Sequence, residues 1–286
     1  MRRTGVAARV MLCFGLLFLY VPIVSMVVFS FNNSRLVTVW DSAHSPTLRW
    51  YSELLSNSQI LDAAALSIAV AVLSACGAVV LGTLAGVALA RFGGFRGRTL
   101  LVGLTTAPLV MPEVITGLSL LLLFVALEQA LGWPRGRGML TITLAHMTFS
   151  MAYVTVVVQS RLAGFDESLE EAAMDLGARP LKVFFRITLP LILPALVSGW
   201  LLAFTLSWDD VVISQFVAGP GSSTLPMVIF SKVRLGVSPD VNALATLMVL
   251  LVSTGIAVAS AWLSRQNRLR ERDIRMAAAT NNLPGA

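Results

Sequence analysis

Three acidic residues stand inside stretches of sequence that are otherwise apolar and uncharged: Glu113, Asp209 and Asp210. An ionised side chain at the centre of a bilayer costs about 2.5–3.5 kcal/mol on insertion scales, so such residues usually face a water-filled path, a cargo or a partner. A path for an anion such as phosphate would need arginine, lysine or helix N-termini, and no Arg or Lys lies deep in these stretches. The acids therefore predict a path for a cationic cargo.

The two neighbouring aspartates cannot both face one path equally if they continue a helix, because consecutive residues point about 100° apart. One aspartate would then line the path while the other caps a helix or pairs with another group. Trp208, directly before them, offers a cation–π surface for an ammonium group or, alternatively, an anchor at the membrane interface. A further alternative places the whole "SWDDVVIS" segment at the external water interface of the membrane that the chain spans, where its acids are simply hydrated.

A second charged segment, "LEEAAMDLGARPLKVFFRITLP" at residues 169–190, interrupts the apolar pattern with acids, a glycine, bases and a proline in that order. Ser168 and Glu171 match the S-x-x-E capping box, which predicts a helix start. Gly177 suits the left-handed residue that ends a helix, and Pro180 suits the first turn of the next one. The pattern therefore predicts a short helix, a sharp turn, and a second short helix that ends at Pro190.

The first predicted helix of this segment has one narrow apolar face with acids around it, among them Glu170, Glu171 and Asp175. An amphipathic helix of this kind could lie on the membrane surface. The anionic inner leaflet would repel its acids, however, whereas a groove on a partner protein could accept an alanine-lined face with acids at its edge. We therefore expect this segment to dock onto a partner protein.

Several familiar kinds of chemistry are missing from the sequence. There is no G-x-x-x-x-G-K-[ST] motif, so the chain is not expected to bind ATP through a P-loop. His44 and His146 are the only histidines, and no nucleophile stands with a base at a recognisable spacing. We expect His146 to be a packed polar residue. We predict no catalytic residue and, with Cys13 and Cys76 inside apolar stretches, no disulfide or metal site.

The elements that position these residues are predicted to be membrane-spanning helices. Of the 286 residues, 56% are hydrophobic and 13% charged, and the mean hydropathy is +0.80, far above that of a soluble domain. Six stretches can cross a bilayer, the third interrupted by Glu113 and bent by Pro108 and Pro112. They cover residues 10–34, 63–90, 99–127, 138–160, 187–208 and 241–264. Gly82 and Gly86 form a GxxxG pattern for close packing, either within the chain or with another chain.

Basic residues alternate between the segments that join these spans. Most of the 21 Lys and Arg residues lie before the first span and after the second, fourth and sixth, which places both termini and the 169–190 segment in the cytoplasm. The external loops are then residues 31–62, 128–137 and 215–240. This topology accounts for the net charge of +6, so no nucleic acid is expected as a partner, and the basic tail is expected to contact membrane lipid headgroups.

A spaced motif runs through the charged segment: Glu171, Ala172, Ala173, Gly177, Ile187, Leu189 and Pro190. It resembles the EAA loop of permease subunits from binding-protein-dependent ABC importers, and the resemblance extends over about residues 61–265. It implies an all-α membrane protein of the bacterial inner membrane with six transmembrane helices and the type I ABC importer permease fold. It also makes the first helix of the loop, through Asp175, a coupling helix that sits in a cleft of an ATPase subunit.

The same resemblance implies a set of partners and a division of the chain. The partners are two ATPase subunits, a second and homologous permease, and a periplasmic substrate-binding protein. ATP and Mg would be held by the ATPase, with no cofactor in this chain. The division is residues 1–60 for the N-terminal segment, first helix and first external loop, residues 61–265 for a permease core with its loop at about 166–190, and residues 266–286 for the basic tail.

Three longer stretches, residues 107–124, 170–185 and 189–221, resemble the permeases of spermidine/putrescine importers, particularly the putrescine type. They imply a polyamine as cargo, in agreement with the acids. Permeases for ferric iron, thiamine and other organic cations share parts of the pattern, so these cargoes stay open. An ion-coupled transporter or channel acting alone, or a membrane-embedded enzyme, would leave the EAA-like loop unexplained.

Overall fold

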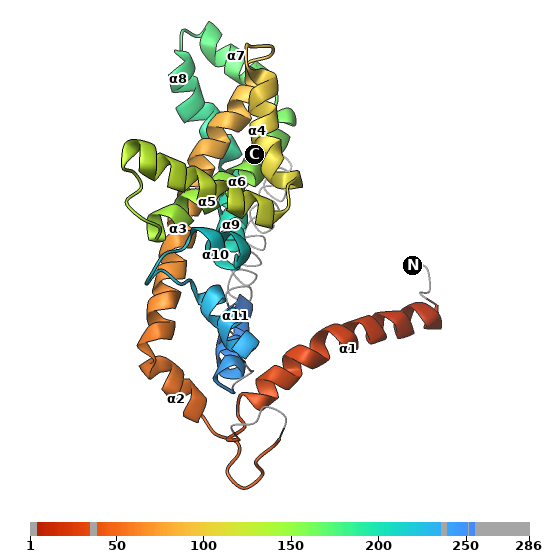
Figure 1. Cartoon of the computed structure of the whole chain (residues 1–286). Coiled ribbons are helices and arrows are strands. Elements are labelled where there is room, and N and C mark those ends of the chain that lie inside the picture. Colours follow the sequence, from red (N-terminus) through yellow and green to blue (C-terminus); the bar gives the residue numbers. More distant parts are fainter. Residues whose placement is uncertain (1–4, 35–38, 236–238, 251, 255–286) are drawn as a thin grey trace, which may run out of the picture. The chain divides into compact units, whose positions relative to one another are not determined.

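The computed structural model describes residues 5–34, 39–235, 239–250 and 252–254, and the regular elements in these ranges are all helices (Figure 1). The chain divides into two compact units. One unit is Ser58–Ser231, and the other combines Met1–Asn57 with Lys232–Ala286. The all-α class predicted from the sequence is confirmed.

Within the described ranges, five helices are long and apolar enough to cross a membrane. They are α1 (Val6–Phe29), α3 (Ser58–Arg91), α5 (Glu113–Leu131), α6 (Met139–Ala163) and the continuous helical run Pro180–Trp208, which ends in α9 (Leu189–Trp208). A shorter apolar helix, Pro239–Thr254, covers the beginning of the sixth predicted span. The rest of that span and the basic tail lie outside the described residues.

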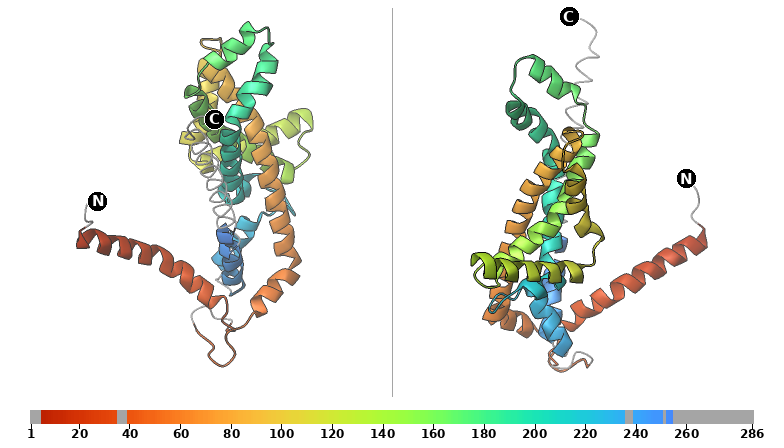
Figure 2. Two further views of the ribbon diagram at one scale, coloured as in Figure 1. Left: turned by 180° about the vertical axis from the view of Figure 1, so that it is seen from behind. Right: turned by 45° about the horizontal axis from the view of Figure 1, so that its top comes forward.

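Helices α3 and α6 pack along each other in the Ser58–Ser231 unit, and α9 packs against both (Figures 1 and 2). Gly82 and Gly86 are buried at this contact. A Cβ atom at Gly82 would lie 2.7 Å from Val154 Cβ, and one at Gly86 would lie 2.8 Å from Val158 Cγ1. The GxxxG pattern therefore brings two helices of the same chain together, which is one of the two roles expected for it.

The third predicted span is not a single bent helix. α4 (Arg98–Val110) ends before Met111, which has an extended backbone (φ −74°, ψ 138°), and α5 begins at Glu113 in another direction (Figures 1 and 2). Pro112 explains the break, because proline has no N–H donor and disfavours the helical region for the residue before it. The expectation that Glu113 lies partway along one span is therefore wrong, since it begins a new helix.

The helix after the sharp turn does not end at Pro190, as the sequence had suggested. α8 (Pro180–Val183) continues through a π-helical segment, η1 (Phe184–Thr188), into α9. The amide of Leu189 donates to the carbonyl of Phe184, five residues earlier. This wider turn accommodates Pro190, which has no amide hydrogen with which to continue the regular pattern. Pro190 lies in the first turn of α9 and does not terminate a helix.

The unit that contains α1 also contains α2 (Arg49–Ser56) and the loop between them. The Trp50 indole donates to the carbonyl of Asn32 at 2.7 Å, and the hydroxyls of Tyr51 and Ser30 lie 2.6 Å apart. These bonds tie the start of α2 to the end of α1 and its following loop. The last labelled helix, α11 (Leu225–Leu235), contains the boundary between the two units.

Candidate functional site

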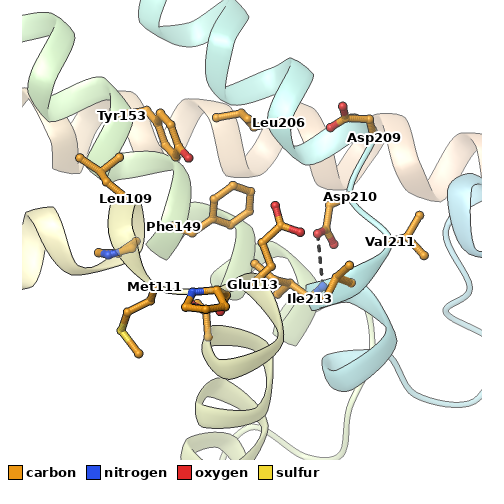
Figure 3. A pocket seen from close by; sticks show the side chains of 14 residues that line it. Leu109, Met111, Glu113, Phe149, Tyr153, Leu206, Asp209, Asp210, Val211 and Ile213 are labelled. Atoms are coloured by element: carbon orange, nitrogen blue, oxygen red, sulfur yellow. Dashed lines mark hydrogen bonds between the residues drawn. The ribbon is translucent and has the colours of Figure 1, made fainter.

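A cavity of about 560 Å³ opens at the break between α4 and α5 (Figure 3). Its walls come from the end of α4, the start of α5, the middle of α6, the end of α9 and the start of α10 (Val212–Val217). The lining residues are Pro108, Leu109, Met111, Pro112, Glu113, Thr116, Phe149, Tyr153, Leu206, Asp209, Asp210, Val211, Val212 and Ile213. Two helix ends and two helix starts therefore meet at one hollow, which we call the acid cavity.

All three acids singled out in the sequence line this cavity. Glu113 is the first residue of α5, whereas Asp209 and Asp210 directly follow α9. Figure 3 shows the carboxylates of Glu113 and Asp210 pointing into the same space. The described lining residues include no Lys or Arg, so the charged side chains that border the cavity are all acidic.

The two aspartates differ in their surroundings. Asp210 is 8% exposed and accepts hydrogen bonds from the amides of Ile213 at 3.2 Å and Ser214 at 2.8 Å, in the first turn of α10. Asp209 is exposed, and neither its side chain nor that of the exposed Glu113 forms a hydrogen bond or ion pair with another residue in the described part of the chain. The expected difference between the aspartates is present, but its cause is the end of α9 at Trp208 and not the 100° step of a continuing helix.

Trp208 does not line the acid cavity among the described residues. Its ring stacks on Phe204 with centroids 6.0 Å apart and an interplanar angle of 12°, and Phe204 stacks in turn on Trp200 at 5.3 Å. The structure therefore groups Trp208 with an aromatic ladder along α9, whereas it brings Glu113 and the two aspartates together.

A buried polar network adjoins the cavity and was only partly expected from the sequence. His146 is fully buried in α6; its Nδ1 lies 2.7 Å from Ser207 Oγ, and its Nε2 lies 3.1 Å from both Asp210 Oδ2 and Ser214 Oγ. Ser74 Oγ of α3 extends the network to Ser207 Oγ at 2.9 Å. These serines were missed from the sequence: Ser207 and Ser74 lie far from His146 in the sequence, and only Ser214, four residues after Asp210, has a position that suggests a contact with that aspartate.

The EAA-like segment (residues 168–190) begins with α7 (Ser168–Asp175). The predicted capping box is wrong, because no side-chain cap bond joins Ser168 and Glu171. Asp166 takes this role: its Oδ1 accepts the amide hydrogen of Ser168 at 3.0 Å, and this bond holds the pKa of the Asp166 carboxyl below its usual value. An acid two residues upstream can reach the free amides of a first turn as well as a serine can, and the sequence pattern does not separate the two.

The sharp turn after α7 has the geometry predicted for it. Gly177 has φ +81°, in the left-handed region. Its amide donates to the carbonyl of Met174 at 2.8 Å, and the amide of Ala178 donates to the carbonyl of Ala173 at 3.1 Å. This pair of bonds is the Schellman motif, in which glycine avoids the steric cost that a side chain would meet. Pro180 then starts α8, as expected.

An ion-pair cluster joins the EAA-like segment to the end of α3. Arg91 contacts both Glu167 and Glu170, and its Nε lies 3.5 Å from Glu170 Oε2. Glu170 also accepts a hydrogen bond from Thr188 Oγ1 of η1 at 2.6 Å. The Arg91 guanidinium lies 5.6 Å from the centre of the Phe165 ring. Glu170 therefore links three elements of the same chain, a role that the sequence did not indicate.

The predicted docking residues lie on the outside of this segment. Glu171, Ala172, Asp175, Gly177 and Pro190 are exposed in the isolated chain, and Ala173 is half-buried. Large apolar side chains flank them: Leu176 is 90% exposed and Leu181 is 74% exposed. A surface that combines apolar side chains with acids suits contact with another protein better than contact with water alone.

No cluster of metal-ligating side chains occurs in the described part of the chain. Cys13 and Cys76 are free thiols, and the Trp200 indole donates to Cys76 Sγ at 3.3 Å. The acid cavity and the EAA-like segment are the two groupings that contain the charged residues singled out from the sequence.

Residues 78–271 match the family described as "Binding-protein-dependent transport system inner membrane component". The chain is 58% identical over 270 residues to the putrescine transport system permease protein PotI of Escherichia coli (strain K12), covering 94% of both chains. It is 43% identical over 248 residues to the spermidine/putrescine transport system permease protein PotC of the same strain, covering 87% of this chain and 90% of PotC.

A crystal structure of a bacterial ABC transporter involved in the import of the acidic polysaccharide alginate has a similar fold. Its TM-score is 0.69 at 18% sequence identity, and the match covers 91% of this chain and 95% of that one. The likeness supports the type I importer permease fold implied by the EAA-like motif. The chain therefore belongs to the family of binding-protein-dependent transport system inner membrane components, multi-pass proteins of the bacterial inner membrane.

Proposed function

We propose that this chain is the permease subunit of an ATP-driven importer for a small polycation such as putrescine or spermidine. The observation that carries the proposal is the convergence of Glu113, Asp209 and Asp210 on one cavity whose described lining contains no Lys or Arg. Similarity to PotI and PotC, which are named for putrescine and spermidine/putrescine transport, gives the cargo class.

The chemistry of the cavity suits a diamine. Its volume of about 560 Å³ lies in the usual range of small-molecule sites, roughly 300–1,000 Å³. Glu113 and Asp209 can attract two ammonium groups, because neither carboxylate is bonded to the side chain or backbone of another described residue. Apolar side chains such as Leu109, Phe149 and Leu206 line the same hollow and can contact the methylene groups between the two charges.

The driving force is proposed to come from separate ATPase subunits. The sequence contains no P-loop, whereas α7 and the turn at Gly177 present acids and exposed apolar side chains on a defined surface. In this proposal two ATPase subunits hold ATP and Mg, one of them receives α7 in a cleft, and a second, homologous permease completes the path. A periplasmic binding protein delivers the polycation from outside.

The proposed cycle is alternating access. Closure of the ATPases moves the EAA-like segment, and the continuous run from α8 through η1 into α9 carries that movement along one helix toward Asp209. The π-helical segment lies in this run, and such segments often mark functional positions in helices. The path opens outward to receive cargo and returns after ATP hydrolysis.

Reconstituted complexes test the proposal directly. Proteoliposomes that contain this chain with its partner permease, ATPases and binding protein should take up labelled putrescine or spermidine only when ATP is supplied to the ATPase side. Excess thiamine, ferric iron or a neutral sugar should not compete. Competition by thiamine or ferric iron would indicate that this cation is the cargo. Uptake in the absence of the ATPase subunits would indicate a stand-alone transporter and contradict the proposed importer.

A further inference from the structure

His146 stands where four helices meet, and the expected role of a packed polar residue does not account for all of its contacts. It is fully buried in α6 and touches polar groups on both sides of the break between α9 and α10. Ser207 lies before the break, and Asp210 and Ser214 lie after it. His146 is therefore the one described side chain that bonds to the end of α9, to the linking residues and to α10.

One arrangement of hydrogens connects Ser74, Ser207, His146 and Asp210 in series. An ionised Asp210 can only accept, so the Nε2 atom of His146 carries the hydrogen that points to it. With one hydrogen on the ring, at Nε2, the Nδ1 atom accepts from the Ser207 hydroxyl, and Ser207 in turn accepts from Ser74. Each side chain in this series of hydrogen bonds, from Ser74 of α3 to Asp210 before α10, has a partner. A buried polar network whose members are all bonded holds one geometry.

We propose that His146 is a positioning residue that fixes the break between α9 and α10 and so assigns different tasks to the two aspartates. It holds the Asp210 carboxylate together with the amides of Ile213 and Ser214. Asp210 thereby becomes an anchor, whereas the adjacent Asp209 lines the cavity, is exposed, and is bonded to no other described residue. Asp209 is then the aspartate that meets the cargo, so this inference rests on the proposed function of the cavity.

Simple packing does not explain the same contacts. Ser150 lies one turn further along α6, is equally buried, and its hydroxyl has no partner among the described residues. Ser150 is therefore a matched position on the same helix, equally buried but without the polar contacts of His146. His146 differs because both ring nitrogens are used, and because its ring also meets Phe149 of the cavity wall edge to face at 5.7 Å.

The test compares His146→Leu, His146→Gln and the control Ser150→Ala by putrescine uptake per assembled complex. Leucine fills the space but leaves the buried Asp210 carboxylate without its donor, so uptake should fall about tenfold or more. Glutamine still offers an amide hydrogen to Asp210 and should keep uptake within about threefold of the unaltered chain. Ser150→Ala should change nothing. Equal losses in the leucine and glutamine variants, or no loss in the leucine variant, would overturn the proposal.

A double-mutant cycle tests the route through Asp210. If His146 acts by holding that carboxylate, His146→Leu should cost no more than about twofold in an Asp210→Asn background. Full additivity would overturn the proposal. If His146→Leu prevents assembly, Ser207→Ala serves instead, since it loosens only the α9 side; uptake equal to that of Ser150→Ala would then refute the role. Absence of putrescine uptake by the unaltered complex would refute the proposed function. That outcome is distinguishable from the failure of the proposal for His146, which is judged from the variants.

Discussion

The EAA-like segment and the acid cavity are both acidic, yet the chain builds them differently. In the segment and the residue just before it, the acids lie along one continuous stretch, from Glu167 to Asp175, and most of them are exposed. In the cavity the acids come from α5 and from the residues after α9, which are about a hundred positions apart in the sequence. A surface for another protein can be formed by one helix and a turn, whereas a site that encloses a small cation needs several elements and a buried network to hold them.

The two regions should therefore respond differently to substitution. A change in the segment should uncouple transport from the ATPases while leaving the cavity intact. A change in the cavity should slow passage of the cargo while leaving the ATPases attached. The variants below are arranged from the largest expected effect to the smallest, and each is read as uptake and as ATPase retention in the purified complex.

Gly177→Val should have the largest effect. The backbone at Gly177 has φ +81°, and a residue with a side chain meets a cost of about 1–2 kcal/mol there, more when it is β-branched. The turn would shift, α7 would no longer fit its cleft, and both ATPase retention and uptake should fall about tenfold or more. Full retention and full uptake in this variant would show that the turn has no docking role.

The next largest effects are expected at the two aspartates, and the two substitutions should have different consequences. Asp209→Asn removes the charge of an exposed carboxylate that is bonded to no other described residue, so uptake should fall several-fold while the yield of assembled complex stays normal. Asp210→Asn alters a buried acceptor that bonds to two amides and His146, so the yield or the melting temperature of the complex should fall as well. Loss of assembly in Asp209→Asn, with normal assembly in Asp210→Asn, would reverse the assignment.

Glu170→Gln and Glu167→Gln form a matched pair in the Arg91 cluster. The side chain of Glu170 is 17% exposed and also bonds Thr188, whereas that of Glu167 is 62% exposed. Surface ion pairs contribute little, about 0–1 kcal/mol, so Glu167→Gln should leave uptake within about twofold. Glu170→Gln should lower uptake further and reduce the ATP dependence of transport. Identical behaviour of the two variants would show that the link from α3 to η1 is not needed for coupling.

The smallest difference concerns the start of α7. Asp166 accepts the amide hydrogen of Ser168 in the first turn of α7, so Asp166→Ala should loosen this turn and weaken ATPase retention slightly. Ser168→Ala should have a still smaller effect, because the structure shows no cap bond from its side chain. A larger loss of ATPase retention in Ser168→Ala than in Asp166→Ala would restore the capping box expected from the sequence.

Local signals in the sequence predicted local structure well. The apolar stretches gave the all-α class, and Gly177 followed by Pro180 gave the turn, because both depend on the conformational limits of single residues. The same limits at Pro112 were visible, but whether a proline bends or ends a helix depends on what surrounds it. Here the helix ends, and the residues at the break, Met111 and Pro112, line the wall of the acid cavity.

Features that depend on distant contacts were not predictable. The network around His146 joins α3, α6, α9 and α10, and nothing in the sequence near His146 indicates Ser74 or Ser207 as partners. The continuation of α8 into α9 depends on a π-helical segment, for which the sequence contains no recognised signal. The pairing of Glu170 with Arg91 likewise joins residues that are about 80 positions apart.

The central claim is that the acid cavity carries a cation, and the double variant Glu113→Gln with Asp209→Asn tests it most directly. Both substitutions keep the size of the side chain and remove only its charge, so the electrostatic attraction is lost while the shape is kept. The measurement is uptake of labelled putrescine per assembled complex, with ATPase retention determined on the same preparation. The account predicts uptake at least about tenfold lower than that of the unaltered complex, with normal ATPase retention. Uptake at the unaltered rate would contradict it.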